Sequence, residues 1–290
     1  MMNRTVKIKG RLNEDPTRTS TLRSKAVSEI NRRYREIKKL ITQSVRKNRI
    51  FANNVEALQK SDFAFEQTPE QMEHFQAWLL LALQALVLTG DNTVNSAQLN
   101  WLMEYIQESY YRGATKGNNE LAAILGRDKV PKQISILDNP FHRSKLQVII
   151  SRDFTQLKGI DAAMSQQIDR VLSEALLEGY SPLKTATLMN DRVDKIGITR
   201  SRLLARTEII YAHNVAKITE GQRIQETIGE EIVYEWITSG DTVVRPTHVQ
   251  RNRKYYSFSR VMGLLGEPNC RCAIALVPIS RLPKGRAVHR

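Results

Sequence analysis

The chain has 290 residues, enough to bury one large core or two smaller ones, and its formal net charge of +14 predicts a polyanionic partner or tolerance of one. We expect a soluble protein made in a cytoplasm, because the N-terminus lacks the apolar segment of a secretion signal and no apolar run is long enough to span a bilayer. The only two cysteines form one C-x-C, which argues against disulfides between distant segments.

The first sixty residues are strongly basic, with 16 lysines and arginines against five acidic residues. Residues 1–20 predict a flexible arm, and apolar residues at three- and four-residue steps predict an amphipathic helix over 24–58. Too few acids are present to pair the cations, which favours contact with DNA phosphate or an acidic partner surface over a solvated face. The candidate residues are Arg32, Arg33, Arg35, Lys38, Lys39, Arg46, Lys47 and Arg49. Because aromatic residues are sparse here, we expect contact with double-stranded DNA that ignores sequence.

Residues 61–145 predict a helical hairpin region followed by a linker. Thr68 and Pro69 begin a helix that runs to Leu88, and a second helix over 96–111 stops at Gly113. A short helix follows over 117–125. Residues 127–144, with two prolines, read as an irregular connection. The block 61–120 is acidic, with eight acids against two basic residues.

The remaining residues change from a helical to an alternating pattern. Helices are predicted over 161–177, over 183–190 after a Ser181 cap, and over 199–226. Strands are predicted over 231–238 and 272–278, with a short element of unclear type over 261–266 and a basic tail over 280–290. The fold class expected is α+β, a mostly helical N-terminal region with a small C-terminal α+β domain. In that domain the helix 199–226 packs on an antiparallel sheet.

Four residues of the C-terminal part are a candidate metal site. Thiolates and imidazole are good zinc ligands, and a carboxylate can supply a fourth donor; the residues are Asp241, His248, Cys270 and Cys272. The alternative needs no cofactor: the cysteines alternate at a strand start and the histidine caps a loop. A structural zinc and no metal therefore both stay open. In either case the loop 239–248 is expected to be pinned against 268–272.

The helix 199–226 carries a polar face. We predict a structural cluster of side chains hydrogen-bonded under the following loop, formed by Arg206, Thr207, Glu208 and Asn214. The alternative is an active-site helix with Glu208 as general base. A Cys–His–Asp triad is chemically coherent, but the cysteines lack the helix N-terminus that commonly activates such thiols.

In order and spacing, these segments resemble the C-terminal domain of phage minor head proteins, the Mu F-like head morphogenesis family. The segments are Ala205-Arg206-Thr207-Glu208, His213-Asn214, Trp236–Asp241, Val244–His248 and Pro268–Cys272. Family members carry a similar Asp, His and Cys-x-Cys order, which implies that these groups converge in space. The sequence departs from the family at 251–254, where a glycine-containing turn is usual.

The resemblance implies a low-copy virion component inside the capsid near the portal. It would act in procapsid assembly and in genome packaging or ejection, without turnover. The expected partners are the portal protein, the major capsid or scaffolding protein and double-stranded DNA, with no membrane in the virion and the host cytoplasm as the place of assembly. The alternative is a zinc-dependent hydrolase or nucleic-acid-processing enzyme using Asp241, His248, Cys270 and Cys272. The chain then divides into 1–60, 61–145, a Mu F-like domain over 146–279, and the tail 280–290.

Overall fold

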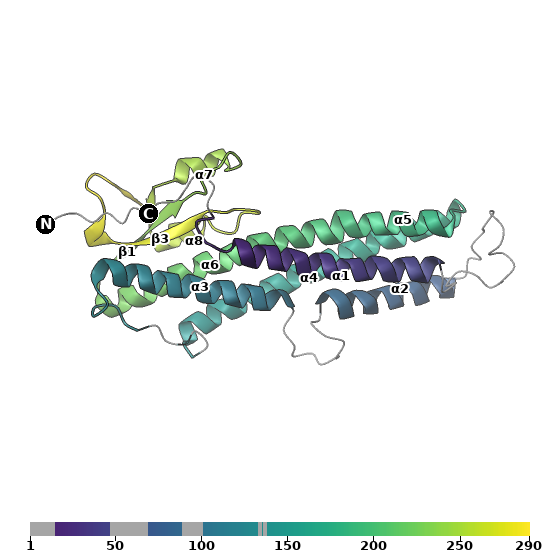
Figure 1. Cartoon of the computed structure of the whole chain (residues 1–290), viewed down its shortest axis with the longest axis horizontal. Coiled ribbons are helices and arrows are strands. Elements are labelled where there is room, and N and C mark those ends of the chain that lie inside the picture. Colours follow the sequence, from purple (N-terminus) through teal and green to yellow (C-terminus); the bar gives the residue numbers. More distant parts are fainter. Residues whose placement is uncertain (1–14, 47–68, 89–100, 133–134, 136–137) are drawn as a thin grey trace. The chain divides into compact units, whose positions relative to one another are not determined.

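The computed structural model describes residues 15–46, 69–88, 101–132, 135 and 138–290 (Figure 1). Over these residues the chain is mostly helical with a small sheet near the C-terminus, so the predicted α+β class is confirmed. Residues 1–14 of the arm predicted over 1–20 lie outside the described residues, as do the candidate cations Lys47 and Arg49.

The elements follow one another in the order shown in Figure 1. The helices are α1 (Ser20–Arg46), α2 (Pro69–Leu83), α3 (Trp101–Leu125), α4 (Pro140–Leu177), α5 (Pro182–Arg192), α6 (Thr199–Ile228), α7 (Pro246–Arg251) and α8 (Phe258–Met262). Two π-helical segments, Gln84–Leu88 and Val193–Ile198, and one 3-10 turn, Ile279–Arg281, complete the helical part of the described residues. The strands are β1 (Ile232–Ile237), β2 (Tyr255–Tyr256), β3 (Ala273–Pro278) and β4 (Val288–His289).

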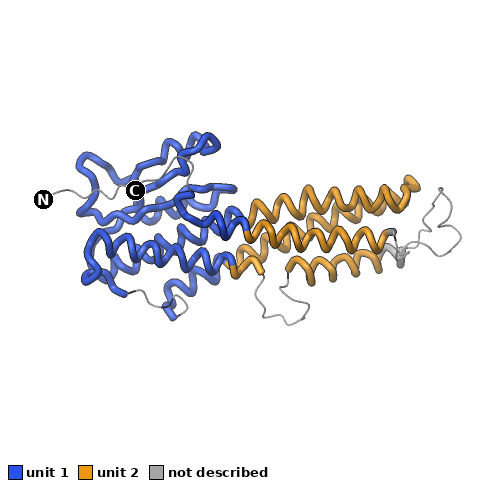
Figure 2. The backbone as a smooth tube through the Cα atoms, in the orientation of Figure 1, with its two compact units in different colours: residues 1–24, 105–149, 206–290 blue, residues 25–104, 150–205 orange. Residues whose placement is uncertain are grey.

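The chain divides into two compact units, coloured separately in Figure 2. Unit 1 comprises residues 1–24, 105–149 and 206–290, and unit 2 comprises residues 25–104 and 150–205. Each unit therefore combines segments that lie far apart in the sequence. The helices α1, α3, α4 and α6 each contribute residues to both units.

Unit 1 contains a four-stranded sheet in the order β3-β1-β2-β4. The expected antiparallel pair is present as β1 and β3, in register from Ile232 opposite Pro278 to Ile237 opposite Ala273. The sequence did not predict β2 or β4, which have two residues each; β2 pairs antiparallel with β1 and β4 pairs parallel with β2. The expected basic tail thus includes a strand.

The core of unit 1 lies between this sheet and the helices α3 and α6. Buried side chains from all three parts pack together, including Leu121 of α3, Ile218 of α6 and Trp236 of β1. Gly117 of α3 and Gly221 of α6 both approach the side chain of Leu276 in β3. The predicted packing of the helix 199–226 on the sheet is therefore present.

Unit 2 has its own core, in which α1 buries the apolar stripe expected from its sequence. Ile30, Tyr34, Ile37 and Ile41 are at most 1% exposed. Tyr34 shares a hydrogen bond with Ser201 of α6 at 2.8 Å and donates one to Asp161 of α4 at 3.2 Å. This buried polar link joins three helices of the unit.

The predicted break at Gly113 is wrong, because α3 continues through Gly113 and Gly117 to Leu125. The two glycines serve close packing against α6. A Cβ on Gly113 would lie 2.1 Å from the carbonyl oxygen of His213, and one on Gly117 would lie 3.1 Å from that of Lys217. Glycine is present here because the backbones approach closely, which a sequence pattern alone does not distinguish from a helix stop.

The predicted linker before residue 145 is shorter than expected, because α4 begins at Pro140 and runs for 38 residues. Asn139 precedes it, and its side-chain oxygen accepts a hydrogen bond from the backbone N–H of Phe141 at 3.0 Å. An asparagine cap followed by proline at the first helical position is a helix start. The predicted helices over 183–190 and 199–226 match α5 and α6 closely.

Candidate metal centre

Three of the four candidate metal ligands meet in unit 1. The Nδ1 atom of His248 lies 3.3 Å from the sulfur of Cys272 and 3.5 Å from the sulfur of Cys270. One donor atom from each residue falls within a group whose members are at most 4.8 Å apart. His248 and Cys272 are buried and Cys270 is partly buried, so the trio forms a largely desolvated site.

The local chain brings these donors together. Pro246 lies in the first turn of α7, where its fixed φ angle suits a helix start. The imidazole of His248, in the same helix, is buried against Trp236 in an edge-to-face arrangement with ring centroids 5.5 Å apart. On the other side, Gly266 and Asn269 adopt positive φ angles of 88° and 55°. The resulting turn delivers Cys270 just before β3.

The polar face of α6 holds both ends of this cysteine turn. The hydroxyl of Thr207 accepts a hydrogen bond from the backbone N–H of Asn269 at 3.0 Å. The amide of Asn214 donates to the carbonyl of Cys272 at 2.9 Å and accepts from the N–H of Ile274 at 3.3 Å. Since buried backbone groups need partners, these contacts fix the position of the C-x-C on α6.

Glu267 is a part of the site that the sequence did not indicate. Its carboxylate lies 2.8 Å from Nε2 of His248 and 2.8 Å from the guanidinium of Arg251. Burial tends to raise the pKa of Glu267, but the hydrogen bond from Arg251 and the nearby His248 lower the pKa overall. The position of Glu267 three residues before Cys270 could have indicated a role in the site. Sequence spacing alone, however, does not show whether its side chain points toward His248.

Asp241 does not join the three donors, contrary to the prediction. Its carboxylate forms an ion pair with Arg271 at 2.5 Å and accepts a further hydrogen bond from the N–H of Val243. Burial tends to raise the pKa of Asp241, but the bond from Arg271 lowers it overall. Asp241 still helps to pin the loop 239–248 to the cysteine turn, through Arg271 instead of a metal.

The two thiols differ strongly in acidity. The hydrogen bond from Cys272 lowers the pKa of Cys270 to about 6, with further help from His248. The same hydrogen bond and burial raise the pKa of Cys272. These opposite shifts favour the thiolate form at Cys270 over that at Cys272.

The other two predicted members of the polar cluster, Arg206 and Glu208, differ in burial. Glu208 is 4% exposed and belongs to the buried part of α6, whereas Arg206 is exposed and so does not belong to the buried cluster.

Four of the predicted basic residues on α1 lie beside acidic side chains. Arg33 is 7% exposed; it pairs with Glu29 and donates to the carbonyl of Leu86, so it is a structural residue. Arg32 also pairs with Glu29, and Lys38 pairs with Asp194 at 2.6 Å. Lys39 lies 3.9 Å from Glu36, Arg35 is exposed, and the side chain of Arg46 is outside the described residues.

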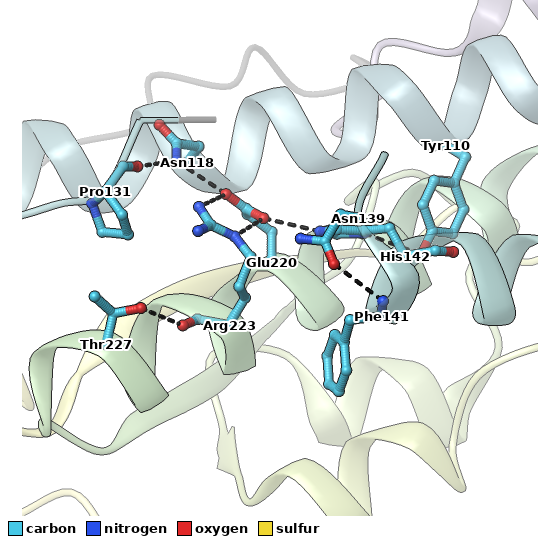
Figure 3. A network of polar contacts seen from close by, with 9 residues as sticks. All are labelled: Tyr110, Asn118, Pro131, Asn139, Phe141, His142, Glu220, Arg223 and Thr227. Atoms are coloured by element: carbon cyan, nitrogen blue, oxygen red, sulfur yellow. Dashed lines mark hydrogen bonds and ion pairs between the residues drawn. The ribbon is translucent and has the colours of Figure 1, made fainter. Parts of the chain in front are cut away.

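A second buried polar cluster surrounds Glu220 of α6 (Figure 3). Its carboxylate accepts from Arg223 at 2.7 and 2.9 Å and from Asn118 at 2.9 Å, and it lies 2.9 Å from Nε2 of His142. Asn118 donates as well to the carbonyl of Pro131. This cluster ties α3, α4 and α6 to the segment after α3, and its satisfied carboxylate indicates a structural role.

Comparison with known proteins agrees with the resemblance seen in the sequence. Residues 166–275 match the family described as Phage Mu protein F like protein. No curated protein and no solved structure matches the chain. Within the described part of the chain, no helix combines the length and the apolar character needed to cross a membrane. Residues 166–275 therefore carry a region similar to the phage Mu protein F like family, which agrees with the resemblance to head morphogenesis proteins seen in the sequence.

Proposed function

We propose that the chain is a low-copy virion protein that acts at the portal, inside the capsid, during procapsid assembly and genome packaging or ejection. The observation that carries this proposal is the family match over 166–275, which includes α5, α6, β1 and the candidate metal centre. The site's geometry is consistent with an assembly role. Most of its polar groups are used to hold one segment of the chain against another.

Deletion of the gene from the phage that encodes this chain tests the assembly role. We expect heads that assemble without full DNA content, or filled heads that fail to deliver it, with rescue by the gene supplied in trans. Particles with normal yield, DNA content and infectivity would contradict the proposal.

The proposed protein partners are the portal protein and the major capsid or scaffolding protein, met in the host cytoplasm during assembly. Cross-linking of purified procapsids followed by mass spectrometry should give links between this chain and the portal. Links to the capsid shell alone would instead favour a role in shell assembly. No link to either protein in procapsids that contain the chain would contradict both.

We propose that any contact with duplex DNA uses the C-terminal part of unit 1 more than α1. Residues 245–290 hold ten lysines and arginines against one acidic residue. Five of these cations are exposed, and no ion pair within the described residues involves them; they are Lys254, Arg260, Arg281, Lys284 and Arg286. Cations without acidic partners are those that phosphate can bind without first displacing a carboxylate.

The sheet edge brings these cations together. The parallel pairing of β2 with β4 places Tyr255 beside Val288, so the segments 251–260 and 281–290 run next to each other. Burial and the charge of Glu235 raise the pKa of Tyr255, and the charges of Arg286 and Arg253 act to lower it. We call the set Lys254, Arg260, Lys284 and Arg286 the C-terminal basic surface.

An enzyme remains the alternative class, and its residues would be His248, Cys270 and Glu267 in place of the predicted His–Asp pair. A thiolate beside an imidazole that faces a carboxylate is an arrangement that nucleophilic catalysis can use. Two observations favour the assembly role. Both sulfurs lie at nearly equal distances from one ring nitrogen, and Glu267 is also bound to Arg251. Phage complementation by Cys270→Ser and His248→Ala variants of unchanged fold would favour assembly, whereas loss of a measured hydrolytic activity would favour the enzyme.

A further inference from the structure

We propose that His248, Cys270 and Cys272 bind one zinc ion, through Nδ1 and the two sulfurs, with Glu267 holding the imidazole from behind. The ion would lock α7 to the segment that enters β3. Zinc binding at this position does not depend on whether the chain acts at the portal.

The distances match a tetrahedral zinc site. Zinc lies about 2.3 Å from a thiolate and about 2.0–2.1 Å from an imidazole nitrogen, so tetrahedral angles separate nitrogen from sulfur by about 3.6 Å. The observed separations of His248 Nδ1 from the two sulfurs are 3.3 and 3.5 Å. Small movements of three side chains would therefore admit the ion.

Glu267 supplies the outer contact typical of such sites. A histidine that binds a metal through one nitrogen usually directs its other nitrogen to a carboxylate or carbonyl, which fixes the ring and strengthens its donor. Nε2 of His248 lies 2.8 Å from Glu267, and Arg251 holds the same carboxylate. The ring is thereby oriented with Nδ1 toward the cysteines.

The site is also built before any ion arrives. Thr207 and Asn214 of α6 fix the backbone on both sides of the C-x-C, and Trp236 packs against the imidazole. A pre-formed site loses little conformational entropy on binding. Two thiolates and one imidazole favour zinc over calcium and magnesium, which prefer oxygen donors.

Within the described residues, no fourth histidine, cysteine or acid belongs to the group of donors. Asp241 is held by Arg271 instead. A water molecule would complete the tetrahedron in the isolated chain, on the side where Cys270 is partly exposed.

The first test uses the unmodified full chain. Protein purified from zinc-supplemented medium should contain about one zinc per chain by elemental analysis, and chelation should lower Tm by roughly 5–10 °C. Replacement by Co²⁺ should give the visible bands of a tetrahedral ion and a thiolate charge-transfer band. Sub-stoichiometric zinc together with no thiolate band would overturn the proposal without any need for a folded variant.

Variants then test the ligand set. Cys270→Ser and His248→Asn should abolish stoichiometric zinc binding, and Glu267→Gln should weaken zinc affinity about 10- to 100-fold while the fold, followed by circular dichroism, is retained. The matched control is Asp241→Asn, which removes a carboxylate that is not among the three donors but leaves an oxygen that can accept from Arg271; this variant should still bind zinc stoichiometrically. Retention of zinc by His248→Asn, or loss of zinc in Asp241→Asn equal to that in Cys270→Ser, would show that this ligand set is wrong.

Discussion

At the scale of single residues, Glu220 shows how unit 1 accommodates a buried charge. It is 1% exposed, and both carboxylate oxygens receive hydrogen bonds. Burial alone would raise the pKa of Glu220, but the bonds from Arg223, His142 and Asn118 outweigh it and lower the pKa from 4.5 to about 2. Stability that comes from this carboxylate is thus present above about pH 4.5 and is lost as the pH falls toward 2.

We predict that Glu220→Gln destabilises the protein by roughly 3 kcal/mol at pH 7, because an amide cannot accept from all three donors and leaves Arg223 unpaired. Urea unfolding at pH 7 measures the loss. The same shift of pKa predicts that wild type and variant become closer in stability between pH 4.5 and 2. A difference that stays constant over this range would contradict the assigned role.

Asp161, in the core of unit 2, has a raised pKa, in contrast to Glu220. Burial raises its pKa from 3.8 to about 7, against the lowering effect of the hydrogen bond from Tyr34. The folded protein therefore retains a proton that the unfolded chain releases, and stability falls as the pH rises from about 4 to 7.

We predict that Asp161→Asn, which keeps an acceptor for Tyr34 but cannot ionise, removes this pH dependence. Relative to wild type, the variant should gain up to roughly 4 kcal/mol of unfolding free energy between pH 4 and pH 8. Urea unfolding at the two pH values gives the comparison. An equal pH dependence in both proteins would show that Asp161 is already ionised in the folded state.

At the scale of elements, the contact of α3 with α6 depends on Gly113. Because a Cβ there would lie 2.1 Å from a backbone oxygen, Gly113→Ala should force the helices apart and destabilise the protein by about 1–3 kcal/mol or more. Gly159 in α4 is the matched control: nothing lies within 4 Å of its Cβ position, so Gly159→Ala should stabilise by about 0.5–1 kcal/mol. Thermal unfolding compares them, and a loss of Tm in both would mean that helix packing is not the cause.

The sequence predicted elements well where periodicity decides them. α5, α6, β1 and β3 follow from alternation or from a three- and four-residue repeat, and Ser181 caps α5 as expected, by accepting from Lys184. The sequence pattern gave wrong helix boundaries at Gly113 and Pro140. A glycine can end a helix or allow close packing, and a proline can interrupt a helix or begin one. The short strands β2 and β4 have two residues each, too few to show any period.

The sequence could identify site residues where only a few side chains of the required chemical type are present. The family resemblance implied that His248 and the two cysteines converge, and polar residues on an apolar helix pointed to Thr207 and Asn214. Acidic residues are many, and the choice between Asp241 and Glu267 depends on which one faces the imidazole, which only the turn at 266–269 decides. The pairing of Arg33 with Glu29 and Leu86 was likewise hidden, because Leu86 is 53 residues away.

At the scale of the whole molecule, the distribution of charge predicts how DNA binding depends on salt. Contact through the five exposed C-terminal cations should give a slope of log Kobs against log salt of about −4 to −5. Affinity would then fall on the order of 10²–10³-fold between 50 and 200 mM. Filter binding of short duplexes of unrelated sequence measures this slope, and similar affinities are expected for all of them.

Matched charge removal distinguishes the two candidate surfaces. Replacement of the four residues of the C-terminal basic surface by glutamine should reduce the slope by about four. The control variant removes four cations from α1 and should change the salt slope little. The residues replaced in this control are Lys25, Arg32, Arg35 and Lys39. The reverse result would return DNA contact to α1, and no salt-dependent binding by the wild type would remove DNA as a partner.

The central claim is that this chain is a minor component of the phage head. Quantitative mass spectrometry of purified virions, with portal and major capsid proteins as internal standards, tests it most directly. We predict that the chain co-purifies with particles at a number comparable to the portal subunits and far below that of the capsid protein. Its absence from both virions and procapsids of the phage that expresses it would contradict the account.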